Sequence, residues 1–243
     1  AGLCGIVRSA EIIRGAEKYS IEEVDKMIAE TVIKRRSCEL ELDYKQYCSY
    51  LGWLRLLSIK RIVSYITDKA HRITYERCKA IEHFLKHNQG GALEIGGGIS
   101  VTRNRSRIFF FRKPNAVKTK QLDVPDRYVI DDWGVLHLSV VDIEKVEFPP
   151  PQYTLFLDWS FNKHVQIMLA PVSSGDRISL LGMKGRRKVS DYLYDSGVPV
   201  FRRKYPAIWI DREIIAIPPF GISKLFKISD SSLQALEIKW EDA

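Results

Sequence analysis

Long hydrophobic runs are absent from this chain of 243 residues, and cysteine is scarce. No apolar stretch approaches the roughly 20 residues that a membrane-spanning helix needs, and the N-terminus lacks the pattern of a secretion signal. The four cysteines lie in the first third of the chain and form no CxxC pair. This indicates reduced thiols rather than disulfides or a metal site. We therefore expect a soluble, cytoplasmic protein that makes no contact with a membrane.

Motifs for catalysis are also missing. The run Gly96-Gly97-Gly98 is followed by a strand-like segment, whereas a phosphate-binding loop precedes a helix whose amides face the phosphate. We therefore predict a hairpin turn. His83 and His87 have the spacing of two ligands on a helix, but no third ligand accompanies them. We predict surface histidines, with a phosphate contact as the second interpretation, and we predict no catalytic residue and no metal site.

Positive charge is what the sequence has in excess, with a formal net charge of +8. Residues 102–120 contain seven cations and no acid, residues 122–181 contain nine acids and four cations, and residues 182–204 contain seven cations and two acids. A single charged run is usually a solvated face. Concentrated blocks of one sign repel one another, however, and a polyanion relieves that repulsion. The distribution therefore favours a nucleic-acid partner.

The periodicity of the apolar residues predicts an α+β protein: a helical module with a small β meander, then a mostly β module with one short helix. We expect one or two helices over the first 35 residues; the capping-box spacing of Ser20 and Glu23 favours a break near Tyr19. Pro114 and Asn115 mark a domain boundary. Further helices are predicted at residues 45–66, 74–90 and 188–194. Strands are predicted at residues 92–95, 99–103, 107–112, 135–141, 153–157, 165–169, 208–210 and 214–217.

The second basic block combines features that suit phosphate binding. The polar turn Gly175-Asp176-Arg177 precedes a glycine-containing loop at residues 182–188, which leads into the predicted short helix. After the Val198-Pro199 step comes a cationic triplet at residues 202–204. Backbone amides, the helix dipole and the side-chain cations would all favour one anion here. Such a layout binds phosphates without reading base sequence.

This order of motifs resembles the C-terminal domain of the isoleucine-tRNA lysidine synthetases. That family shows a GD-R turn, a glycine- and lysine-rich loop, a short helix, a V-P step, a basic triplet and a closing G-hydrophobic-S…F segment, which here runs from Gly221 to Phe226. Residues 73–82 and 96–103 resemble the family's substrate-binding domain, and the opening helices resemble its connector. The sequence departs from the pattern at residues 169–172, which lack an arginine, at Gly197 and at Arg203.

The resemblance implies the tRNA-binding portion of an ATP-dependent ligase that attaches lysine to the wobble cytidine of a minor isoleucine tRNA. Residues 1–113 would be connector helices and a middle tRNA-binding domain, and residues 114–243 a domain that binds the acceptor stem. ATP and Mg²⁺ would bind to an N-terminal domain whose serine-glycine-glycine loop this chain lacks. We therefore expect this chain to bind no cofactor and to be inactive alone. The implied partners are isoleucine tRNA and lysine. Whether the chain forms a homodimer is left open by the sequence.

The expected tRNA contacts are basic residues in two groups. The middle basic patch comprises Arg103, Arg105, Arg107, Arg112 and Lys113. The C-terminal basic patch comprises Lys184, Arg186, Arg187, Lys188, Arg202, Arg203 and Lys204. Two other functions stay open on the sequence: a stand-alone RNA- or DNA-binding adaptor without ligase activity, and a protein-interaction module whose basic face binds acidic partners.

Overall fold

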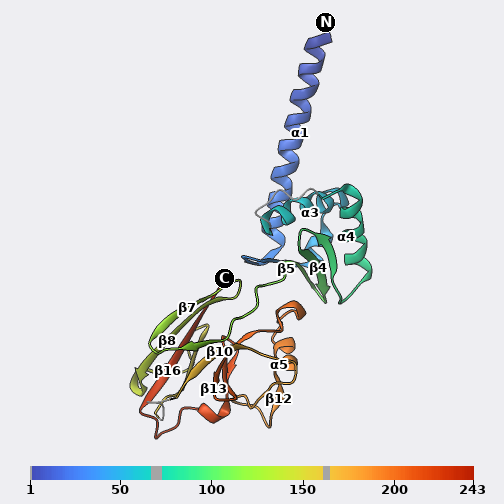
Figure 1. Cartoon of the computed structure of the whole chain (residues 1–243). Helices are drawn as coiled ribbons and strands as arrows, with labels where there is room; N and C mark the ends of the chain where they lie inside the picture. Colours follow the sequence, from blue (N-terminus) through green and yellow to red (C-terminus); the bar gives the residue numbers. More distant parts are fainter. Residues whose placement is uncertain (1, 67–72, 161–164) are drawn as a thin grey trace. The chain divides into compact units, whose positions relative to one another are not determined.

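The computed structural model describes residues 2–66, 73–160 and 165–243. The chain divides into two compact units, residues 1–113 and residues 114–243, and each unit has its own hydrophobic core. The fold class is α+β, as predicted, with helices and a small sheet in the N-terminal unit and mostly strands in the C-terminal unit (Figure 1). No helix in the described part of the chain combines the length and the apolar character of a membrane span.

The N-terminal unit is a five-stranded antiparallel sheet with helices packed against it. The strand order is β1-β2-β5-β4-β3. Alternate residues of the inner strands β2 and β5, namely Leu40, Leu42, Ile108 and Phe110, enter the core that the helices complete, as the two-residue period of a strand requires. The elements are α1 (Gly2–Thr31), β1 (Val32–Arg36), β2 (Glu39–Asp43), α2 (Tyr44–Ser49), α3 (Gly52–Ile66), α4 (Tyr75–His87), β3 (Leu93–Gly96), β4 (Ile99–Asn104) and β5 (Arg107–Arg112).

Helix α1 is continuous, so one helix forms here and the break favoured near Tyr19 is absent. Ser20 lies inside the helix, and its hydroxyl donates to the carbonyl oxygen of Ala16 at 2.7 Å. This local bond gives the hydroxyl a partner within the helix, where the sequence pattern had suggested a cap. The helix ends at Thr31, and the residues after it form strand β1 instead of completing the predicted helix. The predicted three-stranded meander thereby becomes a five-stranded sheet.

The helix predicted over residues 45–66 is in fact two helices, separated at Tyr50 and Leu51. Arg55 of α3 donates through Nη1 to the carbonyl oxygens of Cys48 at 3.2 Å and Tyr50 at 2.7 Å. These bonds satisfy carbonyls at the end of α2 that have no partner within the helix. Because only two residues separate the helices, the helical spacing of the apolar residues continues almost unchanged across the break, and this spacing alone did not predict it.

The C-terminal unit contains two antiparallel sheets and a two-stranded ladder around one core. The sheet orders are β15-β14-β13-β10-β6 and β7-β8-β16-β9, and the ladder is β11-β12. The elements are β6 (Lys120–Leu122), β7 (Asp126–Ile130), β8 (Gly134–Asp142), η1 (Ile143–Lys145), β9 (Thr154–Asp158), β10 (Ile167–Pro171), β11 (Arg177–Ile178), β12 (Arg187–Lys188), α5 (Val189–Asp195), η2 (Val200–Arg202), β13 (Pro206–Ile210), β14 (Glu213–Ile217), β15 (Gly221–Ile222), η3 (Lys224–Phe226) and β16 (Gln234–Asp242).

Strand β16 is the longest element that the sequence prediction missed. It pairs with β8 along its whole length and with β9 on its other side, so it is an inner strand of its sheet. Leu236, Ile238 and Trp240 are buried and alternate with charged residues, and this alternation is the signal that could have predicted it. The strands that were predicted, and helix α5, are present with ends shifted by at most two residues.

Candidate nucleic-acid interface

The basic loop, residues 182–188, is held at its base by short pieces of β-structure. Strand β11 pairs Arg177 with Lys188 and Ile178 with Arg187, so the loop closes a hairpin. Gly182 and Gly185 have positive φ angles of 82° and 74°, a conformation that glycine adopts without steric cost. The loop can therefore turn sharply while its ends stay fixed, and its cations project from an anchored base.

Asp176 joins the polar turn before the loop to the start of helix α5. Its carboxylate accepts a hydrogen bond from the backbone N–H of Ser173 at 2.6 Å, and its carbonyl oxygen accepts one from the N–H of Val189 at 2.9 Å. Val189 is the first residue of α5, so this amide is already paired. The predicted anion site therefore depends on side-chain cations more than on the amides of this seven-residue helix.

The four cations of the basic loop differ in their surroundings. Lys184 and Lys188 are exposed. Arg186 forms an ion pair with Glu213, with Nη2 and Oε2 3.1 Å apart. Arg187 pairs with Asp195 at the other end of α5. Ion pairs this exposed stabilise a fold by less than about 1 kcal/mol, so a phosphate could replace either carboxylate at little cost.

Arg202 is the predicted contact whose position differs most from expectation. It is only 3% exposed. Its Nη2 donates to the carbonyl oxygen of Asp132 at 3.0 Å, and its guanidinium carbon lies 5.1 Å from the centroid of the Trp133 ring. The short helix η2 turns this side chain inward, where a phosphate in solution does not reach it. Arg202 therefore supports the fold of the C-terminal unit in this structure.

The other two residues of the cationic triplet remain at the surface. Arg203 is partly exposed, with its guanidinium carbon 5.7 Å from the centroid of the Tyr194 ring. Lys204 is exposed. The triplet thus presents two of its three charges to solvent.

In the middle basic patch, Arg103 is also engaged within the fold. Its Nη1 donates to the carbonyl oxygen of Leu85 at 2.8 Å, near the C-terminus of α4. Its guanidinium carbon lies 3.5 Å from the centroid of the Tyr44 ring. A cation in this place satisfies a terminal carbonyl and complements the helix dipole. Arg103 therefore ties strand β4 to helix α4.

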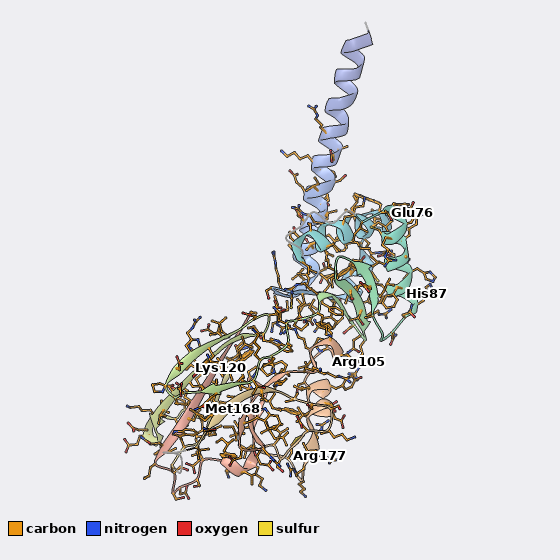
Figure 2. The ribbon with its side chains drawn as sticks, in the orientation of Figure 1. Glu76, His87, Arg105, Lys120, Met168 and Arg177 are labelled. Atoms are coloured by element: carbon orange, nitrogen blue, oxygen red, sulfur yellow. The ribbon has the colours of Figure 1, made fainter. Side chains whose placement is uncertain are left out.

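The remaining cations of the middle basic patch are more accessible. Arg105 is exposed at the turn between β4 and β5 (Figure 2), where its φ is 53°. Arg107 is partly exposed and lies 3.6 Å from Glu41. Burial raises the pKa of the Glu41 carboxyl, and Arg107 acts against this rise. Arg112 is partly exposed and Lys113 is exposed, so all four of these residues reach solvent.

Helix α4 carries an exposed row that was not among the predicted contacts. Tyr75, Lys79, His83 and His87 are exposed and recur every four residues, a spacing that places them on one face of a helix. Lys79 Nζ lies 4.6 Å from the centroid of the Tyr75 ring, and the rings of His83 and His87 are 4.4 Å apart. His87 and Glu76 are at opposite ends of this helix in Figure 2. The four-residue spacing of these residues in the sequence could have predicted this exposed row.

In residues 2–66, 73–160 and 165–243, no group of three or more His, Cys, Asp or Glu side chains is placed to hold a metal ion. Gly97 and Gly98 form the turn of the β3–β4 hairpin, as predicted, and strand β4 follows them instead of a helix. Cys38 and Cys78 are buried thiols and Cys48 is partly buried.

A family model described as "TilS substrate C-terminal domain" matches residues 167–240. This segment contains the polar turn, the basic loop, α5 and the cationic triplet. The predicted family resemblance is confirmed. The chain is also similar to curated tRNA(Ile)-lysidine synthases along almost its whole length.

Three of these relatives show how far the likeness extends. The tRNA(Ile)-lysidine synthase of Caldanaerobacter subterraneus is 24% identical over 241 residues, covering 96% of this chain and 50% of that protein. The Clostridium tetani enzyme is 25% identical over 221 residues, covering 87% and 45%. The Geobacter sulfurreducens enzyme is 29% identical over 168 residues, covering 64% and 34%. The chain thus spans about half the length of the Caldanaerobacter subterraneus and Clostridium tetani enzymes.

A solved structure titled "Crystal structure of TILS C-terminal domain" also matches. It covers 51% of this chain and 98% of that chain, at 14% sequence identity and a TM-score of 0.43.

Proposed function

We propose that this chain is the tRNA-binding portion of a tRNA(Ile)-lysidine synthase. The whole enzyme would be a cytoplasmic ATP-dependent ligase that attaches lysine to the wobble cytidine of a minor isoleucine tRNA. The observation that carries the proposal is the match of residues 167–240 to the TilS substrate C-terminal domain. The exposed cations of the basic loop lie within that segment, and they supply the charge that an RNA backbone requires.

The two units would hold different parts of the tRNA. Residues 1–113 would contact the anticodon-side stem, through Arg105, Arg107, Arg112 and Lys113. Residues 114–243 would contact the acceptor stem, through Lys184, Lys188, Lys204 and the arginines whose carboxylate partners a phosphate replaces. Arg103 and Arg202 would hold the fold around these contacts, because both guanidinium groups are engaged with carbonyl oxygens and aromatic rings. ATP, Mg²⁺ and lysine would bind elsewhere in the whole enzyme.

A charge-reversal experiment on the basic loop tests this proposal. The double variant Lys184→Glu, Lys188→Glu should bind isoleucine tRNA more weakly in a filter-binding titration. The slope of log affinity against log salt is negative, and each lost phosphate contact should reduce its magnitude by roughly one. The magnitude of the slope should therefore be smaller by about two in the double variant. Arg127→Glu is a matched control, because Arg127 is an exposed cation on β7 of the same unit but lies in the acidic part of the sequence.

Each outcome has a definite meaning. Absence of tRNA affinity in the unaltered chain at low salt would contradict the proposed function. A loss in Arg127→Glu half as large as that in the double variant, in proportion to the charge changed, would indicate that only net charge matters. Unchanged affinity in the double variant would move the phosphate contacts away from the basic loop. Tighter binding to heparin than to tRNA at the same salt concentration would favour a module for acidic proteins.

A further inference from the structure

An apolar groove of about 500 Å³ opens beside the basic loop in the C-terminal unit. One wall is the connection between η1 and β9, with Phe148. The other wall is the start of the loop, with Leu181 and Met183, and the floor includes Tyr192 of α5 and Phe220. This volume falls within the range of roughly 300–1,000 Å³ that small-molecule sites usually occupy. The groove is therefore large enough for a single nucleotide.

The rim of the groove exposes large apolar side chains while its floor is closely packed. Phe148 is 71% exposed, and Leu181 and Met183 are 45% and 39% exposed. In the floor, the Tyr192 hydroxyl donates to the carbonyl oxygen of Phe220 at 2.6 Å. A Cβ on Gly221 would lie 3.1 Å from that same hydroxyl oxygen. Exposed apolar clusters of this kind mark binding sites more often than free surface, and this one has a preformed base.

The charge around the groove favours a negatively charged occupant. Met183 directly precedes Lys184, and the exposed cations of the basic loop follow from there. Glu147, which precedes Phe148 in the sequence, is exposed and does not line the groove. An occupant with a flat apolar part and an adjacent negative charge matches this arrangement. An unpaired nucleotide has both, because its base presents a π-face and its phosphate is an anion.

The hydrogen bonding of the rim argues against an extended peptide as the occupant. A peptide that adds to a sheet edge needs free backbone donors. Here the N–H of Leu181 already donates to the carbonyl oxygen of Ile222 at 3.1 Å, and the N–H of Met183 donates to that of Leu180 at 3.1 Å. The loop side of the groove thus offers apolar contact and charge, but these two N–H groups are not available to pair with a peptide strand.

We infer that the groove holds an unpaired nucleotide of the bound RNA, with the base against Phe148 and Met183 and its phosphate toward Lys184. The inference rests on the proposed function, since it presumes an RNA ligand, and it adds a site for single-stranded RNA beside the contacts to duplex phosphates. Base stacking of this kind tolerates any base. The groove would therefore detect that an end or bulge is unpaired, not which base it carries.

Methionine methyl NMR on the full chain tests the inference directly. The chain has three methionines: Met183 lines the groove, Met168 lies on β10 (Figure 2), and Met27 is buried in the core of the N-terminal unit. A short single-stranded RNA should shift the Met183 methyl signal and leave the other two unchanged. A blunt-ended RNA duplex, which would contact the neighbouring lysines but leave the groove empty, should shift Met183 less. No Met183 shift with saturating single-stranded RNA, or an equal shift with the blunt duplex, would overturn the inference.

A pair of variants separates this inference from the proposed function. Phe148→Ala should weaken binding of an RNA hairpin with a single-stranded tail by on the order of tenfold, the scale of one base–aromatic stack. Binding of the same hairpin without the tail, and the salt slope, should not change, because no charge is removed. Leu233→Ala is the matched control, since Leu233 is 75% exposed in the same unit and does not line the groove.

The outcomes of the variant experiment are distinguishable. If the unaltered chain binds tRNA and the tailed hairpin but Phe148→Ala binds the tailed hairpin equally well, the groove inference fails and the proposed function stands. If the unaltered chain binds no tRNA, the proposed function itself fails. A Met183 shift with an apolar peptide but not with single-stranded RNA would assign the groove to a protein partner and overturn the inference.

Discussion

Arg202 gives the sharpest test of the structural reasoning, because sequence resemblance and structure assign it different roles. The resemblance makes it a phosphate contact, whereas the structure buries it to 3% exposure against Trp133 and the carbonyl oxygen of Asp132. We predict that Arg202→Ala destabilises the C-terminal unit and that Arg202→Lys does so almost as much. Lysine keeps the charge but lacks the planar, forked guanidinium that makes both contacts.

The size of the effect follows from the two contacts that are lost. A hydrogen bond from a charged donor contributes about 1.5–3 kcal/mol, and a desolvated cation–π contact contributes up to about 2 kcal/mol. Because the two share one side chain, we expect a combined loss of about 3 kcal/mol from Arg202→Ala. For a unit of this size, 1 kcal/mol corresponds to roughly 3–4 °C in Tm, so Tm should fall by about 10 °C.

Thermal unfolding followed by tryptophan fluorescence is the appropriate assay. Most of the tryptophans report on the C-terminal unit, namely Trp133, Trp159, Trp209 and Trp240. Arg203→Ala is a matched control, since Arg203 is the next residue and also lies over an aromatic ring but is partly exposed. It should lower Tm by only a few degrees, in line with less than about 1 kcal/mol for an exposed cation–π contact.

The tRNA titration completes the test at a temperature well below the Tm of the variants. Arg202→Ala and Arg202→Lys should keep the salt slope of the unaltered chain, because no phosphate contact is removed. The reasoning is refuted if Arg202→Ala leaves Tm unchanged and reduces the magnitude of the salt slope by about one. That result would mean that Arg202 leaves its buried position to bind RNA.

Two further predictions concern backbone space and pH. A Cβ at Gly134, whose φ is +150°, would lie 2.2 Å from the carbonyl oxygen of Glu241, so Gly134→Ala should lower stability by on the order of 3 kcal/mol or more; an unchanged urea midpoint would contradict this. The hydrogen bond to Glu30 raises the pKa of Tyr50 to about 12, above its unfolded value of about 10. The stabilisation from this hydrogen bond should therefore be complete below the unfolded pKa and disappear as pH rises through about 12. A series of thermal-unfolding measurements at different pH checks this, and Tyr50→Phe should show no such pH dependence.

Local patterns predicted much of the fold. Helix α4 begins after Thr74, whose side chain accepts a hydrogen bond from the backbone N–H of Arg77 at 3.2 Å, and the strands around the Gly97-Gly98 turn appear as expected. The prediction failed where a partner distant in sequence decides the outcome. Strand β1 forms because β2 pairs with it, and β16 is an inner strand because β8 and β9 lie on either side.

The same distinction between local sequence and tertiary packing applies to the candidate site. The sequence alone determined which cations are present, their grouping into two blocks and the family whose C-terminal domain residues 167–240 match. Charge and motif order are properties of the chain itself, so no structure is needed to read them. Only the tertiary structure decided which cations reach solvent: it left Lys184 and Lys188 exposed, buried Arg202 and placed Arg103 over Tyr44. An arginine can pair with a phosphate or with a carbonyl and an aromatic ring, and the packing around it determines which of these it does.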